Sequence, residues 1–358
     1  MKKSMKTYPC PWLLSFAIAA SVSACGQPNQ NTATSPDSPK VASNSRLATI
    51  KSRGKLICGI NGEVPGFSFI NEKGEYSGLD VDLCRGIAAA LFDDPSQVEF
   101  RKLSAQERFT ALQSGEVDVL SRNTTWTLSR DTSQGLEFAP TTFYDGQGMM
   151  VRKDKGITKL ADFAGKSVCV LAGTTTEQNL ADQMRKVGVK NYSPVASDDV
   201  DALYAAYQAG RCEGVSSDRS QLIARRSVLP EPQAHILLKE VMSKEPLGPV
   251  VADNDSVWFD VVKWITYTLI QGEEFDINSS NVTTFTSTQD PNIKRFLGTE
   301  GNLGEDMGLT NDFALRVIKH VGNYGEIYER NLGKPLGLER GFNQLWTKGG
   351  LLYSPPFR

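Results

Sequence analysis

Hydrophobic positions between residues 46 and 131 alternate between continuous apolar runs, which predict buried strands, and runs with helical spacing. In chain order they predict a helix at Leu47 to Arg53, a strand at Lys55 to Ile60, a helix from Gly78 through Leu91, a strand at Val98 to Arg101, a helix at Glu107 to Ser114 and a strand from Val117 to Leu120. We expect Asp80 to cap the second helix. This β-α-β-α-β order is typical of a parallel sheet with helices on its faces.

The same alternation continues between residues 160 and 218. It predicts a short helix at Leu160 to Gly165, a strand at Lys166 to Leu171, a helix opened by Gly173 to Glu177, a strand at Tyr192 to Ala196, a helix at Asp198 to Gly210 and a strand at Cys212 to Asp218. Thr174 and Glu177 fit a capping box. Farther on, Val257 to Ile270 and Phe313 to Tyr328 are amphipathic and predict two core-facing helices.

Polar residues follow the apolar run that begins after Gly115. Arg122-Asn123-Thr124-Thr125 comes first, and a single cation, Arg130, follows. A guanidinium fork matches two carboxylate oxygens, and ligands of parallel α/β sheets bind beyond the carboxyl ends of the strands. This stretch therefore predicts a carboxylate site. The alternative is a surface loop followed by a solvated arginine.

Composition narrows the possible chemistry. The chain has 358 residues, which favours two domains. Its formal net charge of −2 does not indicate the basic surface that binds nucleic acid. Two histidines, His235 and His320, leave little material for a histidine metal site or a Ser-His-Asp triad. Gly165-Lys166-Ser167 precedes a strand rather than opening a helix, so it is not a phosphate loop. We expect no nucleic acid, no metal and no cofactor.

The first 45 residues have the pattern of an export segment. Lysines precede a short apolar run, Trp12 to Ala20, that cannot span a membrane. Val22 to Cys25 fits a lipobox, which predicts a signal peptide at 1–24 and a lipid on Cys25. The alternative is an ordinary signal peptide cut after Ala24. Residues 25–45 are predicted to be a flexible tether, because their composition cannot bury enough surface to offset chain entropy.

Several long segments together resemble a known family. They are KLICGINGEVPGFSFINEKGEYSGLDVDLC, LSAQERFTALQSGEVDVLSRNTTWTLSRDTS, FYDGQGMMVRK, SVCVLAGTTTE, SKEPLGPVV, VGNYGEIYERNLG and LWTKGGLLYSPP. They are similar to the general L-amino-acid-binding subfamily of type 2 solute-binding proteins of ABC importers. The resemblance implies an α/β fold of two lobes, each a mostly parallel sheet flanked by helices, joined by a double-crossover hinge. It implies lobe one at 46–144 plus 252–358 and lobe two at 145–251.

The resemblance also implies which residues hold the ligand carboxylate. The spacing between Asp118 and Arg130 resembles the family's ligand motif, so Arg130 is implied to pair the α-carboxylate. Thr125 and the backbone at Asn123 are implied to help it. From the other lobe, a threonine is implied to face the same carboxylate; we expect Thr175, with Thr174 as the second choice.

The ligand's other groups have their own implied partners. Asp218 is implied to take the α-ammonium, although the neighbouring Arg219 departs from the family pattern and can compete for it. Asn61 and Phe67 are implied to face the ligand side chain. Arg122 is a candidate for favouring acidic side chains; the alternative is that it is solvated.

Four cysteines remain for pairing once Cys10 in the signal peptide and Cys25 are set aside: Cys58, Cys84, Cys169 and Cys212. An even set in an oxidising compartment favours disulfides, and four cysteines allow three connectivities. We expect Cys58–Cys84 and Cys169–Cys212, because a bond between lobes would block hinge motion. Free buried thiols are the alternative.

The resemblance implies partners as well. The ligand is a free L-amino acid, with broad specificity for polar, acidic and neutral side chains, delivered to an ABC permease and ATPase complex in the inner membrane. The protein is implied to be a periplasmic monomer without enzymatic activity, attached to the membrane by lipid at Cys25. Two alternatives stay open. One is a dehydratase of the same fold acting on prephenate or arogenate, with Glu63 and Asp145 as candidate acids; the other is a ligand-sensing lobe for a separate membrane receptor.

Overall fold

The computed structural model describes residues 45–358. The predicted signal peptide, the lipid on Cys25 and the tether up to residue 44 lie outside the described residues. Residues 45–358 build two α/β lobes, each around its own sheet, as the sequence predicted. Within them no helix is both long and apolar enough to cross a membrane.

The first lobe is built on a mixed sheet with the strand order β5-β1-β6-β14-β7 and with β8 paired to β14. Its strands are β1 (Leu56–Ile60), β5 (Val98–Lys102), β6 (Val119–Thr125), β7 (Leu136–Phe138), β8 (Phe143–Asp145) and β14 (Glu245–Ala252). β1 is parallel to β5 and β6, whereas β14 is antiparallel to its partners. Its helices are α1 (Arg46–Arg53), α2 (Leu79–Phe92), α3 (Arg108–Gln113) and α4 (Leu128–Ser133).

The second lobe has the strand order β11-β10-β12-β9-β13. These strands are β9 (Gln147–Arg152), β10 (Ser167–Leu171), β11 (Ser193–Ser197), β12 (Gly214–Asp218) and β13 (His235–Leu237). β10 is parallel to β11 and β12, and β9 is antiparallel to β12 and β13. Three helices belong to this lobe: α5 (Thr175–Lys186), α6 (Val200–Gln208) and α7 (Arg219–Ser227).

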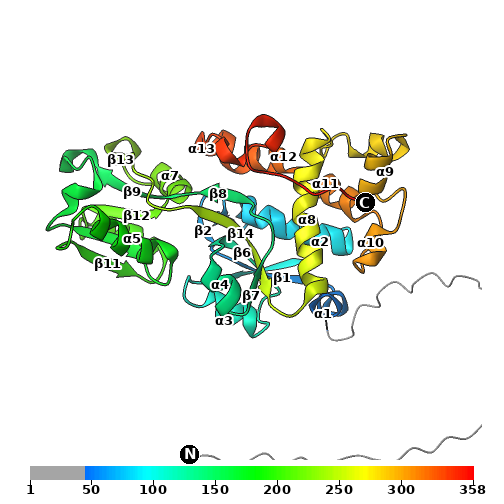
Figure 1. The fold of residues 1–358 in the computed structure, drawn as a ribbon, viewed down its shortest axis with the longest axis horizontal. Coiled ribbons are helices and arrows are strands. Elements are labelled where there is room, and N and C mark those ends of the chain that lie inside the picture. The colour runs from blue at the N-terminus through cyan, green and yellow to red at the C-terminus, as the bar shows by residue number, and fades with distance from the viewer. Residues whose placement is uncertain (1–44) are drawn as a thin grey trace, which may run out of the picture. The chain divides into compact units, whose positions relative to one another are not determined.

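Two strands carry the chain between the lobes. β8 ends at Asp145 in the first sheet, and β9 begins at Gln147 in the second. The chain returns through β14, whose first residue, Glu245, pairs with Asp145 in the sheet register. Figure 1 shows β8 and β14 side by side at the edge of the first lobe that faces the second. A small sheet of β2 (Glu63–Val64), β3 (Ser68–Ile70) and β4 (Tyr76–Ser77) follows β1.

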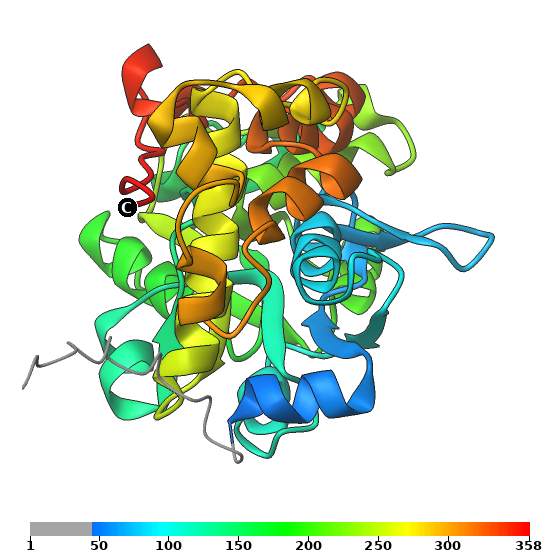
Figure 2. The same cartoon turned by 90° about the vertical axis from the view of Figure 1, so that its right-hand side faces the viewer.

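The long C-terminal region is helical and packs against the first lobe. It contains α8 (Ser256–Glu274), α9 (Pro291–Phe296), α10 (Leu303–Asp306), α11 (Phe313–Val321), α12 (Tyr324–Tyr328) and α13 (Lys334–Leu336). Figures 1 and 2 show α8 (yellow) and α11 (orange) beside α2. Trp258 on α8 is buried, and its indole N–H donates to the carbonyl of Asp118 at 2.8 Å. This satisfies a buried polar group while the ring fills the core.

Two local predictions are wrong. Asp80 does not cap α2; Gly78 holds the cap position, and the Asp80 carboxylate instead accepts hydrogen bonds from the hydroxyl of Ser121 and the backbone N–H of Asn123. The helix predicted from Phe313 to Tyr328 is two helices. They separate at Gly322, whose φ of 80° does not belong to a helix.

Both predicted disulfides are confirmed. Cys58 on β1 is bonded to Cys84 on α2, with their Cα atoms 6.3 Å apart. Cys169 on β10 is bonded to Cys212, just before β12, with a Cα separation of 5.7 Å. Each bond therefore ties elements that belong to one lobe.

Candidate functional site

A small cavity between the lobes collects the predicted ligand residues. This inner cavity has a volume of about 20 Å³, which is room for about one water molecule. It is lined by Asn61, Arg108, Arg122, Asn123, Thr125, Arg130, Leu171, Thr174, Thr175, Thr176, Ser217, Asp218 and Gln221. Every predicted ligand residue lines it except Phe67, which is in the core with its ring edge-on to Phe143 at 5.1 Å.

Arg130 is presented by the end of β6 and the short helix after it. Thr127 caps α4 by accepting a hydrogen bond from the N–H of Arg130, and Arg130 Nη1 donates to the carbonyl of Thr125 at 2.8 Å. Its guanidinium lies 5.2 Å from the ring centre of Phe109. Arg130 is buried, and burial lowers the pKa of its guanidinium. An arginine nevertheless stays protonated in proteins, so Arg130 presents to the cavity a cation with donors that residues 45–358 leave unused.

Asp218 lines the same inner cavity as Arg130, but from the other lobe. It lies at the end of β12, is buried, and makes no side-chain cap to α7. Burial, followed by the charges of Asp145 and Glu245, raises the pKa of Asp218 well above its ordinary value. Arg219 does not compete for it, because Arg219 Nη1 donates to the carbonyl of Leu238 at 3.0 Å. A ligand cation beside Asp218 would favour its charged form.

Asn123 connects the two lobes beside Asp218. Its φ of 36° lies in the left-handed region, which asparagine tolerates better than most residues. Its side-chain Nδ2 is 3.5 Å from Asp218 Oδ2 and 3.4 Å from Gln221 Oε1. Asn123 Oδ1 and Gln221 Nε2 are buried and have no hydrogen-bond partner among residues 45–358. Unpartnered buried polar atoms are costly, so these two atoms are available to a ligand.

The two threonines at the start of α5 have different roles. Thr174 is the N-cap: its hydroxyl donates to the carbonyl of Leu171 at 2.6 Å and accepts from the N–H of Glu177. Glu177 returns its carboxylate to Gly173 rather than to Thr174, so only half of the predicted capping box forms. Thr175 faces the other lobe, with its Oγ1 3.4 Å from Thr125 Oγ1.

Sequence reasoning missed Arg108, which is among the inner cavity's buried cations. It lies on α3, is 3% exposed, and its Nε has no hydrogen-bond partner within residues 45–358. Burial, followed by the charges of Arg122 and Arg130, lowers the pKa of Arg108 well below its ordinary value. Arg122 is better satisfied, since its Nε donates to the carbonyl of Leu103 at 2.8 Å, and burial lowers its pKa to about 10. The sequence around Arg108, Glu107-Arg108-Phe109, contains no pattern that distinguishes it from an arginine on the surface of a helix.

A second, larger cavity adjoins the first through Thr125, Arg130 and Thr175. This outer cavity has a volume of about 480 Å³. Its other lining residues are Ala105, Gln106, Phe109, Thr127, Ser129, Gln134, Gly173, Gln178, Asn179, Ser243, Lys244 and Glu245. Glu245 is a second residue that sequence reasoning missed.

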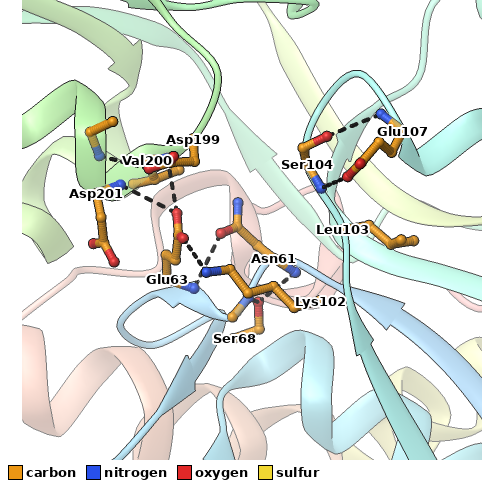
Figure 3. A network of polar contacts seen from close by, with 12 residues as sticks. Asn61, Glu63, Ser68, Lys102, Leu103, Ser104, Glu107, Asp199, Val200 and Asp201 are labelled. Atoms are coloured by element: carbon orange, nitrogen blue, oxygen red, sulfur yellow. Dashed lines mark hydrogen bonds and ion pairs between the residues drawn. The ribbon is translucent and has the colours of Figure 1, made fainter.

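The two candidate acids of the dehydratase alternative are already engaged. Glu63 accepts from the backbone N–H of Val200 at 2.9 Å and forms an ion pair with Lys102 (Figure 3). Asp145 accepts from Ser220 and from the N–H of Gly146, and burial raises its pKa to about 6. Neither residue lines the inner or outer cavity. Within the described residues no group of three or more His, Cys, Asp or Glu could hold a metal ion.

Comparison with known proteins gives a family. The model of the bacterial extracellular solute-binding proteins, family 3, matches residues 56–334. The general L-amino acid-binding periplasmic protein AapJ of Rhizobium johnstonii is 48% identical over 350 residues, which cover 97% of this chain and 99% of AapJ. The glutamate/glutamine/aspartate/asparagine-binding protein BztA of Rhodobacter capsulatus is 47% identical over 320 residues, covering 88% of this chain and 94% of BztA.

A solved structure is similar as well. An ABC transporter periplasmic binding protein from Brucella ovis with glutathione bound superposes with a TM-score of 0.85 at 48% sequence identity. The match covers 88% of this chain and 99% of that chain. The similarity therefore extends over both lobes and includes the long helical C-terminal region.

Proposed function

The chain belongs to the bacterial extracellular solute-binding proteins of family 3, and on that premise we propose that it binds free L-amino acids for an ABC importer. The relatives named above place it in the general amino-acid-binding subfamily. Its role is to capture the ligand between two lobes and deliver it to a permease and ATPase complex, without chemical turnover.

One observation carries this proposal. A buried cation, Arg130, and a buried acid, Asp218, line the same cavity from opposite lobes. An amino-acid head group carries one negative and one positive charge about a single carbon atom, so it complements this pair. A charged group buried without its partner is costly, and a zwitterion between the lobes would supply a partner to each.

The side-chain end of the cavity supports ligands with polar and acidic side chains. Arg108 offers a buried Nε that has no hydrogen-bond partner in the described part of the chain, and Arg122 lines the same cavity. Gln221 Nε2 adds a neutral donor, and Asn123 Oδ1 an acceptor. The carboxylate or amide of a ligand side chain can form hydrogen bonds with these groups, whereas an aliphatic side chain leaves them without hydrogen-bond partners. The name of BztA, with its glutamate, glutamine, aspartate and asparagine, agrees with such a range.

The location follows from the same premise. We propose that the protein acts in the periplasm as a monomer, held at the membrane by lipid on Cys25. Removal of the lipid signal by Cys25→Ser should release the protein from the membrane fraction without changing ligand affinity.

The test is titration calorimetry of the purified protein, freed of carried-over ligand, against the twenty L-amino acids and two D-enantiomers. We expect binding of several L-forms and a loss of affinity of at least about 30-fold in Arg130→Ala, from roughly 2 kcal/mol or more for one partner of a buried charge pair. Arg211→Ala, at an exposed arginine, is the control and should bind normally. A folded protein that gives no heat with any amino acid would contradict the proposal.

A further inference from the structure

Glu245 occupies the entrance between the two lobes, although the hinge strand that carries it gives no sign of this in sequence. It is the first residue of β14 and is 1% exposed. Its carboxylate lines the outer cavity beside Thr125, Arg130 and Thr175, which also line the inner cavity. A buried carboxylate at this position must be paired to be tolerated.

The partners of Glu245 come from both lobes. Oε2 accepts from Thr125 Oγ1 at 2.6 Å and from Thr175 Oγ1 at 3.0 Å. Oε1 accepts from Asn179 Nδ2 at 2.9 Å and from the hydroxyl of Ser243. Thr125 belongs to β6 of the first lobe, whereas Thr175 and Asn179 belong to α5 of the second. One carboxylate therefore bridges the lobes at the mouth of the inner cavity.

The hydrogens of the two threonines limit what else they can bind. A hydroxyl has one hydrogen to donate, and an ionised carboxylate can only accept. While both hydroxyls donate to Glu245, neither can donate to the carboxylate of a ligand. Thr125 and Thr175 are the two hydroxyls implied to help Arg130 hold the ligand's α-carboxylate, so the two carboxylates require the same donors.

We propose that Glu245 is an internal stand-in for the ligand carboxylate, which must displace it in order to bind. This inference rests on the proposed function. Glu245 holds the lobes together over a cavity with room for about one water molecule. The entering amino acid takes the two hydroxyls, and Glu245 retains Asn179 and Ser243.

Such an exchange lowers the apparent affinity. A ligand that binds only after Glu245 has released the threonines can bind only to the fraction of protein molecules in which this release has occurred. If about one molecule in ten is released at a given moment, the apparent Kd is about tenfold higher than the intrinsic one. The energetic cost of displacement is the same for every amino acid, so it lowers all affinities together and leaves their order unchanged.

The test is calorimetry with L-glutamate and L-glutamine on the full exported protein and on Glu245→Gln. Glutamine keeps the size of the side chain but removes the charge that draws both hydroxyls. We expect a Kd about tenfold lower for both ligands. If Glu245 only supported the fold, or if it contacted the ligand's ammonium, Glu245→Gln would raise Kd or leave it unchanged. An unchanged or higher Kd overturns the proposal.

Controls separate this result from the proposed function. Glu72→Gln, at an exposed glutamate, should leave Kd unchanged. If Glu245→Gln does not fold, Glu245→Asp decides instead: its carboxylate is one methylene shorter and lies farther from the two threonine hydroxyls, so Kd should be lower by a smaller factor, and an unchanged or higher Kd overturns the inference. If the wild-type protein binds amino acids and both variants bind more weakly, only the internal stand-in fails. If the wild-type protein binds none, the proposed function fails first and this inference falls with it.

Discussion

Asp80 is a buried acid that ties the strand β6 to a pH-dependent group. Its carboxylate is 4% exposed and accepts from the hydroxyl of Ser121 at 3.2 Å and the N–H of Asn123 at 3.0 Å. These contacts fix the backbone of the polar run at the end of β6. Burial is nevertheless the dominant influence and raises the pKa of Asp80 from 3.8 to about 7.

The raised pKa predicts a pH dependence of stability. Because the folded pKa lies above the unfolded one, Asp80 contributes its full stability below about pH 4, and this contribution is lost as pH rises through about 7. Asp80→Asn removes this titration, so the free energy of unfolding of the variant should rise relative to wild type between pH 4.5 and pH 8, by an amount on the order of 4 kcal/mol at most. Urea unfolding at the two pH values measures it.

The difference between the two proteins isolates Asp80 from the other buried acids. Asp306→Asn, at an exposed aspartate on α10, is the matched control and should keep the wild-type pH profile. Identical slopes for wild type and Asp80→Asn would show that Asp80 is ionised without cost in the folded protein.

Among the elements, the break between α11 and α12 has a clear local cause. Gly322 ends α11 with φ 80° and ψ −178°, a conformation that is essentially restricted to glycine. Asn323 then starts α12 through a capping box with Glu326. A Cβ on Gly322 would lie 2.6 Å from Glu326 Oε2, and the Glu326 carboxylate is already held by the backbone N–H of Asn323 and by Ser279.

Gly322→Ala should therefore destabilise the protein by about 3 kcal/mol, from backbone strain together with disruption of the cap. Gly337→Ala is the matched control, because Gly337 also has a positive φ but its Cβ would meet nothing within 4 Å. This control should cost only about 1 kcal/mol. Chemical unfolding of both variants measures the difference. Equal costs would mean that neither the backbone conformation of Gly322 nor the Glu326 cap adds to the destabilisation.

For the whole molecule, the two lobes also contact each other away from the inner cavity. Glu63 on β2 of the first lobe accepts from the N–H groups of Val200 and Asp201, at 2.9 and 3.3 Å, at the start of α6 in the second lobe. Its other carboxylate oxygen pairs with Lys102, and its backbone carbonyl accepts from Arg225 Nη1 at 2.9 Å. Figure 3 shows the Glu63 carboxylate between Lys102 and the α6 amides. An anion at a helix N-terminus is favourable.

This contact forms only when the lobes meet, so it stabilises the closed protein with or without ligand. Glu63→Gln removes the charge and should weaken amino-acid affinity by about 5- to 30-fold, corresponding to about 1–2 kcal/mol for a charge-assisted contact. Faster ligand dissociation in stopped-flow measurements should account for the change, because the head-group contacts remain.

The control for this effect is Glu99→Gln. Glu99 pairs with Lys55 at 2.8 Å, and both residues belong to the first lobe. It removes the same charge without touching the second lobe and should leave affinity unchanged. If Glu63→Gln also binds like wild type, the Glu63 contact does not influence closure.

The sequence by itself determined the order of strands and helices and the polar run that leads to Arg130. These features depend on short-range spacing: an apolar run makes β1 or β6, and the chain direction of β6 carries Thr125 and Arg130 to the carboxyl edge of the sheet. The resemblance to a family implied the two lobes, on which the choice of disulfide partners rested, and the other predicted residues of the inner cavity. The break at Gly322-Asn323 was missed, although glycine followed by Asn-x-x-Glu is a cap signal.

Only the tertiary structure decided the roles of Arg108, Glu63 and Glu245. Glu245 meets Thr125 across 120 residues of sequence, and Glu63 meets Val200 across 137. Spacing along the chain carries no information about such pairs, because they depend on how two separately built sheets face each other. Arg108 became distinctive only in the folded chain, where its Nε is buried and finds no hydrogen-bond partner in the part that the structure describes. The unmet charges and shared donors of this site exist only in the assembled pair of lobes.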